Sequence, residues 1–415
     1  MAKGTANAPP SKSYTHRAMV MGALTHNNFT LKNPLMSDDT KATLDALYAM
    51  GAEFRSTAVG ILIHCEKLRH SPGVIDARNS GTTMRLMAGI ASLLPGFTTL
   101  TGDESLVRRP MAPLIDSLTQ LGAKCTYLGS PGRPPLKIVG PITKAATEIS
   151  GDISSQFVSS LLIACSQKAG DTHVKVRGQL RSRPYVDITL QMLRDFGADV
   201  SEDSDGFAVK GAQRLARDSY SVPGDYSSSA FPLVAGAITG GKVTVNGLDP
   251  DSPQGDKAIV QHLSTFGAKV ASHGHSVSVA GGSLHGAEID VRHTPDLFPI
   301  LAVLGAVSEG TTVLKGGENL RAKESDRIAT TTSFLHDMGA EIAPTRDGCR
   351  IVGVDRLHGA KVQTQGDHRI LMAAAIAGLV STSETVIGEA ESFNISYPGF
   401  LRDMHQLGCR MVVKR

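Results

Sequence analysis

Six stretches of this chain share one pattern of apolar and polar positions. An amphipathic segment ends at a glycine, and alternating apolar residues follow: LYAMGAEF, LTQLGAKC, LRDFGADV, LSTFGAKV, LHDMGAEI and MHQLGCRM. The pattern predicts the end of a helix, a glycine in the left-handed cap position and a strand that begins two residues later. The glycines recur about every seventy residues, a period longer than that of the common solenoids, at Gly51, Gly122, Gly197, Gly267, Gly339 and Gly408.

A second pattern runs in phase with the first. Helical segments that are apolar on all sides begin near Arg17, Met84, Phe157, Ala230, Leu297 and Ile370. A helix without a polar face must be buried on every side. Each unit therefore predicts one buried helix, one amphipathic helix and several short strands. Three units can close into one body, so six units predict two bodies; a structural repeat protein without chemistry is the alternative.

Length and composition agree with two domains and exclude some classes of protein. A chain of 415 residues exceeds the size of a single core. The net charge of +3 is too small to indicate a nucleic-acid or membrane-surface protein. The five cysteines show no metal or redox spacing, which favours a reducing compartment, and the longest apolar runs are about half of the ~20 residues that a membrane span needs. We expect a cytoplasmic protein without a signal or transit segment.

Polar residues precede every buried helix. The segments read KSYTHR, RNSGTTMR, GDISSQ, GDYSSS, TPD and QGDHR. Taken singly, each is explained by helix capping, because Ser, Thr, Asn and Asp are the favoured N-caps. If the buried helices of each body are parallel, however, their N-termini share one end, and two bodies that face each other enclose a cleft lined by backbone N–H groups. Such a cleft favours phosphate or carboxylate.

Cations stand where a helix dipole disfavours them. Lys12, His16 and Arg17 open the first buried helix, and His368 and Arg369 open the last. Positive charge at a helix N-terminus is unfavourable unless an anion binds there. These positions therefore predict an anionic ligand.

Further candidates lie in the same kinds of segment. Arg109 precedes Pro110, so we expect it to be extended and to point outward from a loop, while Gly81 lets an anion approach the backbone. Lys323 and Arg327 are four apart on a predicted helix, a repulsive pair unless an anion lies between them. The alternative for this pair is a solvated, salt-bridged helix start with Glu324 and Asp326.

Two carboxylates are candidates for acid and base catalysis. Asp296 and Glu324 are the acidic residues expected within the cationic ring. Neighbouring cations lower the pKa of a carboxyl group and burial raises it, so one group can stay ionised as a base while the other serves as an acid. For Asp296, a simple N-cap of the following helix is the alternative.

Taken in order, nine motifs make the whole chain resemble the EPSP synthases (3-phosphoshikimate 1-carboxyvinyltransferases) of the enolpyruvyl transferase family. They are SKSYTHR, NSGTTMR, RRP, SSQF, SRPYVDITL, GDYSSSAF, PDLFP, NLRAKESDR and GDHR. The resemblance implies an α/β (α+β) fold of two pseudo-threefold domains, each with three βαβαββ units around buried parallel helices, the inside-out α/β barrel of this family. Residues 11–222 would form one domain and residues 1–10 with 223–415 the other, with the active site in a cleft that closes by induced fit.

The resemblance also implies a reaction. The enolpyruvyl group of phosphoenolpyruvate would be transferred to the 5-hydroxyl of shikimate 3-phosphate, releasing phosphate, in aromatic amino acid biosynthesis. Both substrates are polyanions, as the misplaced cations require. Phosphoenolpyruvate is a co-substrate, and we expect no cofactor or metal, no nucleic-acid or membrane partner, and a monomer.

Site residues follow from the motifs position by position. Asp296 would be the proton acceptor, Glu324 the proton donor, and Lys12 would contact both substrates and take part in catalysis. The substrate-binding residues would form four groups: Ser13 and Arg17 for the shikimate phosphate ester; Gly81, Arg109 and Gln156 for the phosphoenolpyruvate phosphate; Arg327 and Arg369 for its carboxylate; and Ser154, Ser155, Ser182, Tyr185, Asn319 and Lys323 for the shikimate-phosphate pocket. Asn79 and His368 are also expected to bind substrate.

One departure and two rival functions remain. The family often has a lysine three residues before a proline near the C-terminus, where this chain has Ile395 in NISYPGF. The rivals are the sister transferase that acts on UDP-N-acetylglucosamine, which typically has Lys-Asn at the first motif and a cysteine in the loop before the arginine, and a non-catalytic two-domain binder of phosphorylated metabolites. His273 and His275 form an HGH pair that is better explained as a polar turn than as a metal site.

Overall fold

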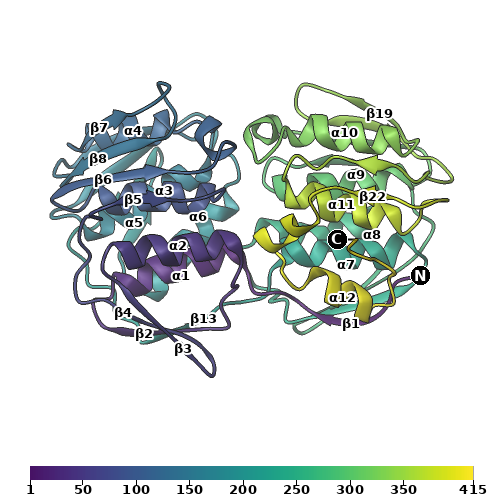
Figure 1. Cartoon of the computed structure of the whole chain (residues 1–415), viewed down its shortest axis with the longest axis horizontal. Helices are drawn as coiled ribbons and strands as arrows, with labels where there is room; N and C mark the ends of the chain where they lie inside the picture. Colours follow the sequence, from purple (N-terminus) through teal and green to yellow (C-terminus); the bar gives the residue numbers. More distant parts are fainter. Residues whose placement is uncertain (415) are drawn as a thin grey trace. The chain divides into compact units, whose positions relative to one another are not determined.

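The computed structural model describes residues 1–414, and the chain divides into two compact units (Figure 1). The N-terminal unit is Pro10–Val222, and the C-terminal unit combines Met1–Pro9 with Pro223–Arg415. The chain thus passes from one unit to the other twice, at the prolines near residues 10 and 223. Within residues 1–414, no helix combines the length and apolar character needed to cross a membrane.

The N-terminal unit contains three four-stranded sheets, ordered β13-β2-β4-β3, β5-β6-β8-β7 and β9-β10-β12-β11. Its helices are α1 (Lys12–Ala23), α2 (Asp38–Ala49), α3 (Gly81–Ala91), α4 (Ala112–Gln120), α5 (Ser155–Gln167) and α6 (Pro184–Asp195). Its strands are β2 (Asn28–Lys32), β3 (Glu53–Thr57), β4 (Gly60–His64), β5 (Val74–Asp76), β6 (Gly96–Thr101), β7 (Lys124–Tyr127), β8 (Leu136–Gly140), β9 (Ala146–Ser150), β10 (Thr172–Arg177), β11 (Val200–Glu202), β12 (Gly206–Val209) and β13 (Ser219–Ser221).

The C-terminal unit repeats the plan. Its sheets are ordered β1-β14-β16-β15, β17-β18-β20-β19 and β21-β22. Its helices are α7 (Tyr226–Ile238), α8 (Ile259–Thr265), α9 (Phe298–Ala306), α10 (Arg327–Asp337), α11 (His368–Gly378) and α12 (Phe400–Gln406). Its strands are β1 (Lys3–Asn7), β14 (Lys242–Asn246), β15 (Lys269–His273), β16 (Ser276–Ala280), β17 (Glu288–Asp290), β18 (Thr311–Lys315), β19 (Glu341–Pro344), β20 (Cys349–Val352), β21 (Lys361–Val362) and β22 (Val386–Ile387).

Every four-stranded sheet is built in the same way. The first two strands are parallel, and in three of the five four-stranded sheets of the described chain a buried helix joins them, as α3 joins β5 to β6. The last two strands form an antiparallel hairpin, as β7 and β8 do. Strands β1 and β13 each complete a sheet whose other strands lie far away in sequence, because β1 pairs with β14 and β13 with β2. These pairings tie each end of the crossing segments into its own unit.

The predicted repeat is confirmed in its main features. All six repeat glycines have positive φ, between 78° and 109°. The buried helices exist, but most begin a few residues before the predicted points, because the polar residues in front of them form the first turn. The sixth unit is reduced: residues after α12 form no hairpin within the described chain, so its sheet has only β21 and β22.

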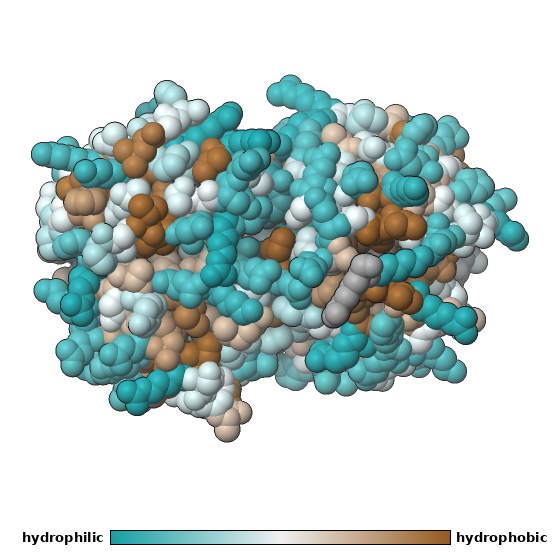
Figure 2. Space-filling view, in the orientation of Figure 1, coloured by the Kyte–Doolittle hydropathy of each residue, from teal (hydrophilic) through white to brown (hydrophobic). Residues whose placement is uncertain are grey.

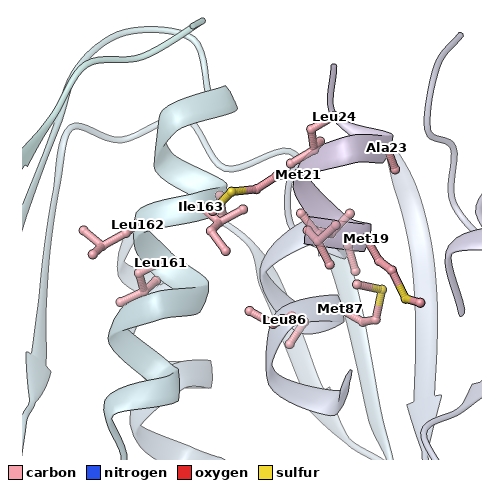
Figure 3. Close-up of a cluster of buried hydrophobic side chains, with 14 of the residues drawn as sticks. Met19, Met21, Ala23, Leu24, Leu86, Met87, Leu161, Leu162 and Ile163 are labelled. Atoms are coloured by element: carbon pink, nitrogen blue, oxygen red, sulfur yellow. The ribbon is translucent and has the colours of Figure 1, made fainter. Parts of the chain in front are cut away.

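The core of each unit is made by its three buried helices. In the N-terminal unit these are α1, α3 and α5, and Figure 3 shows side chains from all three in one cluster, among them Met21, Met87 and Ile163. In the C-terminal unit, every residue of α9 is buried. The face seen in Figure 2 is mostly hydrophilic, with apolar side chains in separate patches. Burial of apolar area on this scale is the main stabilising term of each unit.

Candidate active site residues

Hydrogen bonds join the first turns of the buried helices in the N-terminal unit. From α1, His16 Nδ1 lies 2.7 Å from Thr43 Oγ1 on α2, which lies 2.7 Å from Thr83 Oγ1 on α3. From α5, Gln156 Nε2 donates to Thr82 Oγ1 on α3 at 2.9 Å. The polar ends of these helices therefore lie together, as the sequence predicts for an anion site.

Arg17 is a buried cation in this network. Its side chain is 1 % exposed, and its guanidinium donates to Ser13 O (3.0 Å), Tyr185 O (3.0 Å), Ser159 Oγ (3.2 Å) and Thr189 Oγ1 (2.7 Å). All four acceptors are neutral, and burial lowers the pKa of Arg17 to about 10. A buried positive charge held by neutral groups makes the surrounding N-terminal unit attractive to an anion.

The other residues predicted for the shikimate-phosphate pocket in this unit lie at helix starts and a strained turn. Lys12 begins α1, and its Nζ lies 2.8 Å from Asp39 Oδ2. Ser154 caps α5 through the backbone N–H of Gln156, and Ser155 is the first residue of that helix. Ser182 has a φ of 53° just before α6, a backbone conformation that is typical of constrained functional sites.

Gly81 lies beneath two guanidinium groups. It is the first residue of α3, and a Cβ placed on it would lie 2.7 Å from Arg85 Nη1 and 3.2 Å from Arg109 Nη1. Arg109 also donates to Asn79 Oδ1. Two arginines at the N-terminus of a helix form a site suited to phosphate, which can also approach the glycine backbone closely.

The prediction for Arg109 is half right. Its backbone is extended, with φ −78° and ψ 142°, as the following proline requires. Its side chain does not point outward: the residue is only 5 % exposed. The contacts with Asn79 and Ser105 fold the guanidinium back over α3.

In the C-terminal unit, Arg327 joins three carboxylates. It donates to Asp296 Oδ1 (2.8 Å), Glu324 Oε2 (2.7 Å) and Asp367 Oδ2 (2.8 Å) and is 1 % exposed. These charges hold the pKa of Arg327 well above its ordinary value, although burial opposes the shift. The guanidinium therefore remains charged and fixes the relative positions of both predicted catalytic carboxylates.

Asp296 is surrounded by cations. Arg369 Nη2 lies 2.8 Å from its Oδ2, and Lys323 Nζ lies 3.9 Å from its Oδ1. Burial alone would raise the pKa of Asp296, but Arg369, Lys323 and Arg327 outweigh it and lower the pKa well below its ordinary range. Asp296 is therefore ionised at neutral pH, and the capping alternative is wrong, because the residue lies inside the short 3-10 turn Pro295–Leu297 rather than at its cap.

The prediction that Lys323 and Arg327 share a helix is also wrong. Lys323 is extended at the end of the 3-10 helix Glu318–Ala322, and α10 begins at Arg327 with Asp326 as its N-cap. The capping carboxylate requires a non-helical backbone, which interrupts the helix between the two cations. The alternative of a solvated, salt-bridged helix start is right in part: Arg327 pairs with Glu324 and Asp326 caps α10, but the Arg327 guanidinium is buried rather than solvated.

Two carboxylates escaped sequence reasoning. Asp367 is fully buried and binds Arg327, and it also caps α11 through the backbone N–H of Arg369. Asp256 is 4 % exposed and accepts a hydrogen bond from Ser227 Oγ at the start of α7. Burial and the charge of Asp296 raise the pKa of Asp256 to about 7, against Arg369 and the Ser227 bond. Asp367 was visible in QGDHR, where capping explained it fully; Asp256 had no signal.

The remaining predicted positions divide between this cluster and its surroundings. Asn319 lies in the 3-10 helix Glu318–Ala322, and His368 is the buried first residue of α11. Ile395 ends the 3-10 helix Ala390–Ile395. His273 is the last residue of β15 and His275 lies in the turn of the β15–β16 hairpin, as the polar-turn prediction states.

One group of side chains has the spacing of a metal site. Within the described residues, ligand atoms of His173, Asp203 and Asp205 lie within 4.8 Å of one another, but the group is largely exposed. Lys175 Nζ lies 3.0 Å from Asp205. A cation that already neutralises one carboxylate weakens such a site, and the group has no link to the clusters described above.

Comparison with known proteins identifies the family. The sequence profile of EPSP synthase (3-phosphoshikimate 1-carboxyvinyltransferase) matches residues 2–404. The chain belongs to the EPSP synthase family. A 3-phosphoshikimate 1-carboxyvinyltransferase from Methanocorpusculum labreanum is 45% identical over 412 residues, covering 98% of this chain and 97% of the relative. The enzyme of that name from Methanocella arvoryzae is 46% identical over 414 residues, covering 99% and 97%.

A solved structure of the family has the same fold. EPSP synthase from Acinetobacter baumannii superposes with a TM-score of 0.81 at 30% identity and covers 98% of this chain and 96% of that one. The predicted fold class is therefore confirmed. Neither rival, the UDP-N-acetylglucosamine transferase or the non-catalytic binder, is favoured by these EPSP synthase relatives.

Proposed function

We propose that this protein transfers the enolpyruvyl group of phosphoenolpyruvate to the 5-hydroxyl of shikimate 3-phosphate and releases phosphate. The relatives carry the name of this activity. The observation within the molecule that supports it best is the bonding of Asp296 and Glu324 to one buried guanidinium, that of Arg327. A protein that only binds anions has no need of two carboxylates inside its cationic cluster.

The N-terminal unit supplies sites for the two phosphate groups in this proposal. Arg17, Ser13 and Lys12 at the start of α1 bind the phosphate ester of shikimate 3-phosphate. Gly81 and Arg109 bind the phosphate of phosphoenolpyruvate at the start of α3. Arginine and backbone N–H groups at a helix N-terminus suit both. Gln156 joins Gly81 and Arg109 at the phosphoenolpyruvate phosphate. The pocket for shikimate 3-phosphate takes Ser154, Ser155, Ser182, Tyr185, Asn319 and Lys323.

The C-terminal unit supplies the acid and the base. The hydroxyl oxygen forms a bond to C2 of phosphoenolpyruvate while Asp296 accepts its proton and Glu324 donates a proton to C3. In the second step the bond from C2 to the phosphate oxygen breaks, the ionised Glu324 takes a proton back from C3, and the double bond is restored in the product. The proton held by Asp296 leaves with the phosphate. Each proton transfer needs a positioned group, and these two are positioned by Arg327.

The arginines link substrate binding to the strength of the base. Arg327 and Arg369 are proposed to bind the carboxylate of phosphoenolpyruvate, with His368 beside them, and both donate to Asp296. A substrate carboxylate would share these donors, which weakens their hold on Asp296 and raises its pKa toward its ordinary value. The base therefore becomes stronger when the substrate that needs it arrives.

The proposal extends to the setting of the reaction. The enzyme acts as a cytoplasmic monomer of two domains, residues 11–222 and residues 1–10 with 223–415, without a metal or organic cofactor. Ile395 contributes no cation, so Lys12 and Arg109 provide the positive charge for the phosphate. Because the proposed enzyme needs no metal, we expect its activity to be unchanged after dialysis against a chelator.

The test is phosphate release by the full chain. Phosphate should form only when phosphoenolpyruvate and shikimate 3-phosphate are both present, and UDP-N-acetylglucosamine should not replace the second substrate. Release with the nucleotide sugar would indicate the sister transferase. Tight binding of both substrates without release would indicate a binding protein.

A further inference from the structure

We propose that Asp103 is a positioning residue for the phosphoenolpyruvate phosphate site, acting through Asn79 on Arg109. The inference rests on the proposed function, since Arg109 is the residue it serves. Asp103 lies in the loop between β6 and α4, in the segment GDESLVRRP. No sequence pattern indicates a role for it.

The carboxylate of Asp103 binds two segments at once. Its Oδ2 accepts a hydrogen bond from Asn79 Nδ2 at 2.6 Å, and its Oδ1 accepts one from the backbone N–H of Leu106 at 2.8 Å. The backbone N–H of Asp103 donates to Arg78 O at 2.8 Å. One residue therefore connects the loop that carries Arg109 to the segment that leads into α3.

The side-chain amide of Asn79 links Asp103 to Arg109 by hydrogen bonds. Asn79 gives its NH₂ group to Asp103 and accepts from Arg109 Nη2 on its oxygen, so the carboxylate decides which way the amide faces. With the amide reversed, two donors would face each other at Arg109. The amide thus keeps the guanidinium over Gly81, where its Nη1 lies 3.2 Å from the position of a Cβ.

Asp103 also fixes the backbone next to Arg109. Its Oδ1 accepts from the backbone N–H of Leu106, the first residue of the 3-10 turn Leu106–Arg108, and Arg109 follows that turn directly in extended conformation. The two oxygens of Asp103 thus have separate roles: Oδ1 orders the turn, and Oδ2 orients the amide of Asn79.

The neighbouring Glu104 is a suitable control, because its carboxylate has neither role. Its side chain is 93% exposed and lies 3.4 Å from an exposed Arg108.

The variant Asp103→Asn separates these tasks. Its amide oxygen still accepts from Leu106, but its NH₂ group meets the NH₂ group of Asn79 and turns that amide around. Loss of a hydrogen bond to a charged donor corresponds to a change of about tenfold or more. We expect KM for phosphoenolpyruvate to rise about tenfold, with KM for shikimate 3-phosphate and the unfolding temperature unchanged, while Glu104→Gln matches the wild type.

The outcomes are distinct. An unchanged KM for phosphoenolpyruvate in Asp103→Asn, with an active wild-type enzyme, would overturn the inference and leave the proposed function standing. Parallel increases in both KM values with a lower unfolding temperature would also overturn it, because they indicate a purely structural residue. A wild-type protein without phosphate release overturns the proposed function first.

Discussion

At the residue scale, the chemistry depends on how one buried cation is shared. Arg327 binds Asp296, Glu324 and Asp367, so the position of each of these carboxylates is fixed by the same guanidinium group. Breaking one pair in a buried group of this kind costs about 3 to 5 kcal/mol when it leaves a charge uncompensated. The same ion pairs therefore position the proposed catalytic carboxylates and stabilise the folded unit. A substitution that tests catalysis must leave these ion pairs or their hydrogen bonds in place.

Glu324→Gln is such a substitution. The glutamine oxygen can still accept from Arg327, but the group has no acidic proton to give to C3. We expect kcat to fall by about a hundredfold to ten-thousandfold, while binding of shikimate 3-phosphate, measured by calorimetry, persists. Asp326→Asn is the matched control: asparagine still caps α10, so its turnover should stay near that of the wild type. Unchanged turnover in Glu324→Gln would remove Glu324 from the mechanism.

At the scale of elements, the buried helices approach one another through small residues. Gly89 on α3 packs against α5, and a Cβ at this position would lie 2.9 Å from Ser160 O and closer still to its hydroxyl. Backbone atoms cannot move aside as a flexible side chain can. The close approach of α3 and α5 therefore depends on this glycine.

Gly89→Ala should lower the free energy of unfolding by about 1 to 3 kcal/mol, because overpacking outweighs the better helix propensity of alanine. Denaturant titration measures the loss. Gly73→Ala is the control: a Cβ there meets nothing within 4 Å and φ is not in the left-handed region, so this variant should match the wild type or exceed it slightly. Equal stability of the two variants would show that α3 and α5 tolerate a wider separation.

The junction of α1, α2 and α3 predicts a pH effect on stability. His16 is fully buried, and burial, followed by Lys12 and Arg17, lowers its pKa well below the ordinary value. Below about pH 6.5 the unfolded chain binds a proton that the folded chain does not, so stability falls as pH decreases, by up to about 1.4 kcal/mol per pH unit. Above this pH the residue has no effect.

Unfolding free energies between pH 5 and 7.5 test this expectation. His16→Gln should flatten the dependence relative to the wild type, whereas His336→Gln, on the exposed side of α10, should leave it unchanged. A pH dependence that persists in His16→Gln would assign the effect to other groups.

Sequence patterns predicted the elements and their repeat because both follow from short-range rules. A glycine after an amphipathic segment marks a left-handed cap, and all six such glycines have positive φ. The patterns failed where a side chain overrides the local preference. Asp326 caps α10 and so ends the apparent helix that would have joined Lys323 to Arg327.

The site was predictable only in part for the same reason. Cations at helix starts are visible in sequence as a conflict with the dipole, which singled out Lys12 and Arg369. Buried carboxylates such as Asp256 and Asp367 create no such conflict, because their partners come from distant segments. Their roles appear only when the fold places Ser227 or Arg327 beside them.

At the scale of the whole molecule, the two units have the same design but differ in the charged side chains that they bring together. The N-terminal unit concentrates cations and neutral donors around Arg17, Arg85 and Arg109, whereas the C-terminal unit concentrates carboxylates around Arg327. Strands β1 and β13 complete one sheet in each unit from the far end of the sequence. In the proposed function, phosphate binding and proton transfer fall to different units, so we expect activity to require the full chain.

The central claim, that carboxylates of the C-terminal unit protonate and then deprotonate C3 during enolpyruvyl transfer, is tested most directly by turnover in deuterated water. Proton NMR of the product measures it. We predict an enolpyruvyl ether of shikimate 3-phosphate with deuterium at C3, since the transient methyl group gains one deuteron and loses hydrogen or deuterium. Product formed without deuterium at C3, or phosphate released without any enolpyruvyl product, would contradict the account.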